Sequence, residues 1–457
     1  MPHRYRWVLL LGASCYFYMV FVPVYILILG FTIVVDYFAG ILLETIHKKW
    51  RKMFLIASII ANVGVLAFFK YYNFLNENLT VFLRGFSVDN PVPYLSILLP
   101  IGLSFHTFQA MSYTFEVYRG HQKAERHFGI YALYVMFFPQ LVAGPIERPQ
   151  NMLHQFHEKH YIDYYRIAEG IKLILWGMFK KVVIADRLSE YVNVVYNNPT
   201  EYQGPHLILA TVFFSFQIYC DFSGYSDIAR GTARILGYNL MVNFRRPYLS
   251  KSIHEFWGRW HISLSTWFRD YLYISMGGNR VSVPRHYFNL FFVFLISGLW
   301  HGANYTFIIW GAMHGFYLVF AKFTEPLRNR INTFMQLPKF PGLFNLSQGF
   351  ITFILATYAW IFFRATSLQD ALYITKNLFN WENVSNINLF HFPVDLYLSF
   401  ALIILLFVFD GLEEKLKISE RLKVSPAIVR WAVYATSVIV LVVLGVWKSA
   451  DFIYFQF

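Results

Sequence analysis

Two histidines stand among large apolar and aromatic residues, His261 within HEFWGRWHISLSTWFRD (254–270) and His301 within SGLWHGANY (297–305). A neutral imidazole, with an ordinary pKa of about 6.5, can take the proton of a sugar hydroxyl that attacks a thioester and pass it to the leaving thiolate. We therefore treat His261 and His301 as candidate catalytic residues. The segment 252–321, which contains both, is the candidate active-site region.

Other site chemistries lack the residues that they need. Two imidazoles could begin a zinc site, but no HExxH or CxxC pattern supplies the remaining ligands, so we expect no bound metal. A serine hydrolase is excluded because the GxSxG nucleophile elbow is missing from the sequence. No pattern identifies residues that would bind a cofactor.

Polar residues elsewhere in apolar surroundings receive a structural interpretation. His106 and His314 are expected to be packed or to line a cavity rather than to act in catalysis. In QIYCDFSGYSDIARG, the charged residues Asp221, Asp227 and Arg230 suggest a chamber wall or internal charge pairs.

At helical spacing, the stretch around His261 predicts one amphipathic helix. An apolar stripe opposes a polar face that consists of His254, Gly258, His261, Ser265 and Arg269. Such a helix fits two roles, an interfacial helix with an aromatic belt or one wall of a reaction chamber. The residues alone leave both roles open.

The run before His301 is short for a membrane crossing. Residues 287–300 would form a helix of only about 21 Å, whereas a bilayer core is about 30 Å thick. We therefore expect His301 at a helix break at membrane depth, between Gly298 and Gly302. An ionisable residue at that depth indicates a functional site, because burying it is costly. The alternative is a neutral imidazole bonded to a backbone carbonyl.

The composition places these residues in a membrane protein. Of 457 residues, 57% are hydrophobic and 14% are charged, whereas soluble domains carry roughly 25% charge. Apolar segments long enough to cross a bilayer recur along the chain, so we predict an all-α polytopic protein. We expect about eleven or twelve transmembrane or re-entrant helices in a single membrane domain, residues 1–457. The net charge of +13 comes from short basic loops, which favours contact with anionic lipid headgroups and argues against nucleic-acid binding.

The first apolar segments predict a topology. The N-terminal segment has a basic start without a clear cleavage site, so we interpret it as a retained helix that ends near Pro23. Later crossings are expected near 53–70 and 94–115. Because HKKWRK (47–52) and YRGHQKAERH (118–127) are basic and the loop near 74–92 is not, both basic loops and the N-terminus should face the cytoplasm.

Two later stretches predict irregular helices. FFPQLVAGPIERP (137–149) and GMFKKVVIADR (177–187) put prolines, glycines or charges beside short apolar runs. Broken or re-entrant helices are expected there, because such backbone persists in a membrane only where it is buried in protein or lines a wet cavity.

The sequence resembles the membrane-bound O-acyltransferase superfamily, specifically its bacterial branch of alginate O-acetyltransferase-like proteins. The matching pieces include PIGLSFHTFQAMSYTFEVYRG, FFPQLVAGPIERP, NFRRPYLSKSIHEFWGRWHISLSTWFRDYLYISMGGNR, SGLWHG and FIYFQF, in order along nearly the whole chain. This branch usually begins with an additional hydrophobic helix, whereas this chain opens directly on RYRWVLLLGASCYFYMV.

The resemblance implies a ring of tilted helices around a funnel-shaped chamber. It places His301 at the catalytic histidine position of the family and His261 at that of the second active-site histidine. It implies an O-acyltransferase of the cytoplasmic (inner) membrane that moves an acyl group, expected to be acetyl, toward an exported polysaccharide such as alginate or cellulose. The donor would be a thioester substrate, acetyl-CoA or an acyl carrier protein. Periplasmic SGNH-type acetyltransferases would be partners.

Two other functions remain open at the level of the sequence. A D-alanyl transfer protein of teichoic acid assembly belongs to the same superfamily and takes its donor from a carrier protein. A transporter or flippase would also explain a helical bundle with a polar lining, although transport alone gives no reason for a catalytic imidazole.

Overall fold

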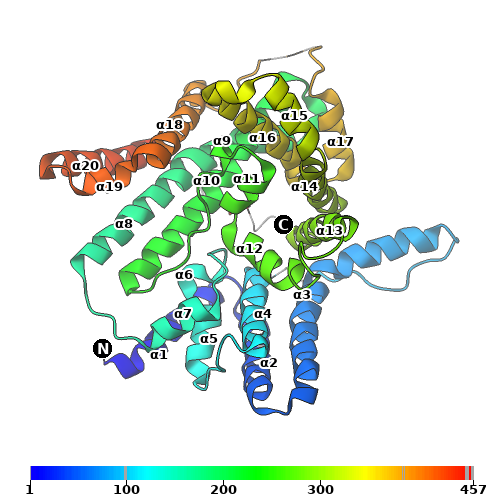
Figure 1. Cartoon of the computed structure of the whole chain (residues 1–457), viewed down its shortest axis with the longest axis vertical. Coiled ribbons are helices and arrows are strands. Elements are labelled where there is room, and N and C mark those ends of the chain that lie inside the picture. Colours follow the sequence, from blue (N-terminus) through cyan, green and yellow to red (C-terminus); the bar gives the residue numbers. More distant parts are fainter. Residues whose placement is uncertain (1, 97–99, 383, 385, 448–451, 454–457) are drawn as a thin grey trace. The chain divides into compact units, whose positions relative to one another are not determined.

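The computed structural model describes residues 2–96, 100–382, 384, 386–447 and 452–453. Within these residues the secondary structure is helical, and no strand occurs among them (Figure 1). The all-α prediction is therefore confirmed. The chain divides into two compact units, residues 1–174 with 229–242 and residues 175–228 with 243–457. The single membrane domain expected for residues 1–457 stays a prediction.

The first unit contains seven complete helices and parts of two more. They are α1 (Arg6–Met19), α2 (Ile26–Thr45), α3 (Lys48–Arg84), α4 (Leu103–Arg119), α5 (Phe128–Met136), α6 (Phe138–Leu141) and α7 (Pro149–His157), with most of α8 (Tyr164–Met178) and the end of α10 (Pro205–Leu236). A 3-10 turn, Pro23–Tyr25, separates α1 from α2, which confirms the break expected near Pro23.

The second unit contains the candidate active-site region. Its helices are the end of α8, α9 (Asp186–Asn197), most of α10, α11 (Ile253–Arg259), α12 (Ile262–Trp267), α13 (Val283–His301), α14 (Tyr305–Phe323), α15 (Glu325–Phe334), α16 (Pro341–Arg364), α17 (Leu368–Asn377), α18 (Val394–Leu416), α19 (Ile418–Lys423) and α20 (Ala427–Leu444).

Seven of the described helical segments are long and apolar enough to cross a membrane. They are Pro23–Thr45, Lys48–Arg84, Pro205–Leu236, Tyr305–Phe323, Pro341–Arg364, Val394–Leu416 and Ala427–Leu444. The helices α1, α4 and α13, which also correspond to expected segments, are shorter or more polar. The chain is therefore a multi-pass membrane protein.

Two boundaries in the first unit differ from the prediction. The loop expected near 74–92 is helical as far as Arg84, because α3 continues for 37 residues, and its second half has a polar face that lowers the average hydropathy. The segment expected from residue 94 begins at Leu103, after Gly102. Gly102 has φ 75°, and a Cβ there would lie 2.8 Å from the carbonyl oxygen of Leu141, so glycine fits this start.

The two stretches that predicted irregular helices behave differently. In 137–149 the helix α6 ends at Leu141 and α7 begins at Pro149, so the expected break is confirmed. In 177–187 the chain stays helical, and a π-helical turn, Phe179–Ala185, joins α8 to α9. The expectation of a broken helix was wrong there, because the extra residue of the turn is absorbed without ending the helix.

Candidate active site

The helix expected around His261 is interrupted at that residue. The helix α11 ends at Arg259, His261 adopts the left-handed conformation with φ 42°, and α12 begins at Ile262. The prediction of one amphipathic helix with a continuous polar face was therefore wrong. The segment that contains Asn243 and Arg245 supplies backbone hydrogen bonds on both sides of this interruption. Arg245 N donates to Arg259 O (2.9 Å), and Ile262 N donates to Asn243 O (2.9 Å).

Asn243 fixes the protonation pattern of His261. The backbone N–H of Ser263 donates to the Asn243 side-chain oxygen (3.1 Å), which identifies that atom as an acceptor. His261 Nδ1 lies 3.2 Å from the same oxygen, so Nδ1 carries the proton and Nε2 is the acceptor atom of the ring. Burial lowers the pKa of His261 to about 3. The imidazole, which is only 1% exposed, is therefore neutral.

His301 is the last residue of α13, and the backbone turns to an extended conformation at Gly302. A Cβ at Gly302 would lie 2.2 Å from the Phe307 ring, so a larger residue would require that ring to move. The helix break expected at His301 is confirmed, and its depth in a membrane stays a prediction. The His301 side chain is 5% exposed, and its ring centre lies 4.9 Å from that of Trp310 and 5.1 Å from that of Phe363.

Closely packed glycines hold α13 against α14. A Cβ at Gly298 would lie 2.3 Å from Phe307 O, and a Cβ at Gly311 would lie 2.4 Å from Phe294 O. Gly311 and Gly315 are one helical turn apart, the small-residue spacing that lets membrane helices approach closely. This spacing in GAMHG was a signal in the sequence that our motif search missed.

Trp300 brings the two candidate histidines into one aromatic cluster. Its ring centre lies 6.4 Å from that of His261 and 4.8 Å from that of His301. The structure therefore gathers both residues of the candidate pair in the second unit. The cavity that we expect them to share stays a prediction.

His314 extends the same cluster and is fully buried. Its ring centre lies 5.0 Å from that of Trp310, and Trp257 Nε1 donates a hydrogen bond to His314 Nδ1 (3.2 Å). His314 is therefore packed as expected, and its exclusion from catalysis stays a prediction. His106 is buried in α4 of the first unit, which agrees with its expected packing.

The aspartates of α10 form the expected charge pairs. Lys181 Nζ lies 2.7 Å from Asp221 and 2.8 Å from Asp186, and Lys180 Nζ lies 2.6 Å from Asp227. Both lysines belong to the π-helical turn, so this turn supplies the cations that neutralise the buried carboxylates. Arg230, which the sequence analysis grouped with Asp221 and Asp227, lies in the part of α10 that belongs to the first unit.

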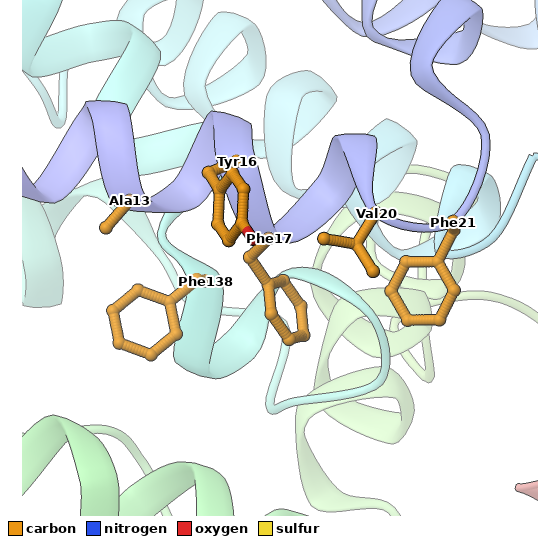
Figure 2. Close-up of a pocket in the computed structure, with 6 residues that line it drawn as sticks. All are labelled: Ala13, Tyr16, Phe17, Val20, Phe21 and Phe138. Atoms are coloured by element: carbon orange, nitrogen blue, oxygen red, sulfur yellow. The ribbon is translucent and has the colours of Figure 1, made fainter.

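No group of three or more His, Cys, Asp or Glu residues that could hold a metal ion occurs among the described residues. The absence of a metal from the active protein stays a prediction. An apolar pocket lies in the first unit, which does not contain His261 or His301. Figure 2 shows that its lining comes from α1, residues just after α1, and α6; these are Ala13, Tyr16, Phe17, Val20, Phe21 and Phe138, and none of them is a histidine or carries a charge.

Comparison with known proteins adds evidence from ancestry. Residues 43–368, which include His261 and His301, match the model of the membrane-bound O-acyltransferase family. The chain is 40% identical over 383 residues to the probable alginate O-acetylase of Pseudomonas aeruginosa. This match covers 83% of this chain and 70% of that protein. It is 36% identical over 401 residues to the peptidoglycan O-acetyltransferase of Helicobacter pylori, with 82% and 73% covered. It is 29% identical over 240 residues to the teichoic acid D-alanyltransferase of Bacillus subtilis, and this match covers 49% of this chain and 59% of that protein.

Proposed function

Because the chain belongs to the membrane-bound O-acyltransferase family, we propose that it moves an acetyl group from a cytoplasmic thioester toward an exported polysaccharide. Relatives that cover more than four fifths of the chain are named as acetylases of alginate or peptidoglycan. The relative named for D-alanyl transfer covers only about half of the chain, which favours acetyl as the group transferred. None of the relatives described above is named as a transporter.

The observation that carries the proposed chemistry is the position of His301 at the buried end of α13. In the proposed reaction an acceptor hydroxyl oxygen attacks the carbonyl carbon of the thioester, while His301 takes the hydroxyl proton as general base. The carbon–sulfur bond then breaks, and the proton passes to the departing sulfur. The products are an ester and a free thiol.

His261 is proposed to orient the acceptor. With its proton held on Nδ1 by Asn243, a neutral His261 offers Nε2 as a hydrogen-bond acceptor for a second hydroxyl group of the acceptor, not the one that His301 deprotonates. An acceptor held in this way would present its reacting hydroxyl oxygen to the thioester, and orientation of this kind lowers the entropic cost of reaching the transition state.

The proposed cellular setting is the cytoplasmic membrane. The donor, acetyl-CoA or an acyl carrier protein, is charged and cytoplasmic, whereas the acceptor polymer is outside, so the reaction needs a passage between the two sides. Periplasmic SGNH-type acetyltransferases are proposed to complete the transfer to the polymer.

The ester groups on the exported polymer test this function. We would delete the gene, restore it on a plasmid, and identify the acid released from the purified polymer by mild base. The proposal expects acetate to disappear in the deletion strain and return on complementation. Unchanged acetate would contradict the proposal, and selective loss of D-alanine would instead indicate D-alanyl transfer.

A further inference from the structure

The second half of α3 forms a projecting arm with the segment that follows it. We call residues 71–96 the α3 arm. Figure 1 shows α3 bending, so that its second half, in light blue, turns away from α2, α4 and its own first half. The returning segment is tied to one face of the helix, because Asn73 exchanges two hydrogen bonds with the backbone of Leu95 (2.8 and 3.0 Å) and Asn76 Nδ2 donates to Val92 O (3.1 Å).

A different face of the arm helix carries a line of exposed apolar side chains. Steps of four and three residues place Leu75, Leu79 and Phe82 on one side of the helix, where they are 63%, 40% and 63% exposed. Phe86, in the turn that follows the end of the helix at Arg84, is 67% exposed. Glu77 and Arg84 are also exposed. Each follows a member of the line by two residues, about 200° around the helix, so the charges lie opposite the apolar line.

We propose that the α3 arm lies along the membrane surface, with this apolar line inserted into lipid and Glu77 and Arg84 toward water. A straight helix of 37 residues would measure about 55 Å, well beyond a bilayer core of about 30 Å. The bend instead directs the second half along the surface, at the end of the span opposite the basic segment 47–52, whose residues 48–52 begin α3.

The lipid surface is the proposed occupant because the arm continues a helix whose first half exposes apolar side chains along a candidate membrane span. The first half of α3 exposes Met53, Ile56, Ile60 and Val63 within a candidate membrane span. The arm itself contains one arginine and two acidic residues, Glu77 and Asp89. Apolar burial rather than attraction to anionic headgroups therefore holds it at the interface.

Depth-dependent fluorescence quenching tests the arm in the full-length protein. Cys15 and Cys220 are replaced by Ala, and single cysteines are introduced as Leu79→Cys or, as the matched control on the opposite face, Glu77→Cys. Each is labelled with an environment-sensitive dye in phosphatidylcholine nanodiscs that contain a nitroxide-labelled lipid. We expect severalfold stronger quenching at position 79 than at 77.

A second pair, Phe82→Cys against Arg84→Cys, repeats the comparison farther along the helix and guards against a local folding failure at one position. Equal quenching on the two faces would overturn the proposal. So would a label on the line that stays in water in pure lipid and is shielded only in native membranes, because that result would indicate a protein partner.

Discussion

At the scale of single residues, the best-supported feature is the set of bonds around Asn243. One side-chain oxygen accepts from the Ser263 backbone (3.1 Å), from the Ser263 hydroxyl (2.9 Å) and from His261 Nδ1 (3.2 Å). These bonds stabilise the left-handed backbone at His261, which costs about 1–3 kcal/mol for a residue other than glycine. The orientation of the candidate imidazole therefore depends on a residue 18 positions earlier in the chain.

Replacing Asn243 should separate orientation from stability. Asn243→Ala leaves buried donors unpaired, at about 1–3 kcal/mol each, and frees the tautomer of His261. We expect a large loss of acetyl ester and a lower melting temperature of the purified protein. Asn243→Asp keeps an acceptor oxygen and should retain most activity. Full activity in Asn243→Ala would show that this oxygen does not position His261.

The sequence allowed both candidate histidines to be predicted but not their supports. His261 and His301 are conspicuous because each stands among large apolar and aromatic residues. Asn243 gave no such signal, because its role arises only when the helix breaks at His261 and the distant segment fills the gap. The same break explains why helical spacing misassigned the polar face.

At the scale of elements, the hairpin of α13 and α14 places His301. Its helices approach so closely that Gly311 has no room for a side chain, since a Cβ would lie 2.4 Å from the backbone oxygen of Phe294. Backbone atoms cannot move aside as a flexible side chain can, so a larger residue must separate the two helices.

We therefore expect Gly311→Val to destabilise the protein by more than the 1–3 kcal/mol typical of overpacking. Less protein should reach the membrane, and the melting temperature in detergent should fall. The matched control is Gly258→Ala in α11, where nothing lies within 4 Å of the added Cβ. A Gly311→Val protein as stable as the control would contradict the close packing.

The hydrogen bond from Trp257 to His314 links α11 to α14. His314→Leu leaves the buried Trp257 N–H without an acceptor, which destabilises the packing of α11 on α14 by about 1–3 kcal/mol. We expect the transfer rate to fall, because this packing positions the aromatic cluster around His301. His314→Asn, which presents an acceptor near the position of Nδ1, should retain more activity. A double-mutant cycle with Trp257→Phe should be non-additive, and additive effects would show that the bond does not couple the two helices.

At the scale of the whole molecule, apolar segment length predicted an all-α multi-pass protein. Seven helices among the described residues are long and apolar enough to cross a membrane, and the expected total of eleven or twelve transmembrane or re-entrant helices stays a prediction. The extension of α3 beyond residue 70 was missed. Mean hydropathy over a window of sequence combines the apolar line of this helix with its polar face, so the segment resembles a loop. The π-helical turn at Phe179–Ala185 was also missed, since a π-turn depends on backbone geometry that composition does not encode.

Topology is the prediction that belongs to this scale. The basic residues predict that the N-terminus, the basic segment 47–52, of which residues 48–52 begin α3, and the segment 118–127 face the cytoplasm. A cysteine introduced as Trp50→Cys, at a half-exposed position, should react with an impermeant maleimide only after the cells are opened. Labelling of intact cells at this position would reverse the assignment.

The most direct test of the central claim is the acetyl ester content of the exported polymer in a His301→Gln strain, measured beside an immunoblot of the membrane fraction. Removal of the proposed base should lower the rate by about 10²- to 10⁴-fold while the protein stays at wild-type level. His261→Ala should have a comparable or smaller effect, and His254→Ala, at an exposed position of α11, should behave as wild type. Normal ester content with His301→Gln protein present would contradict the assignment of His301 as the general base.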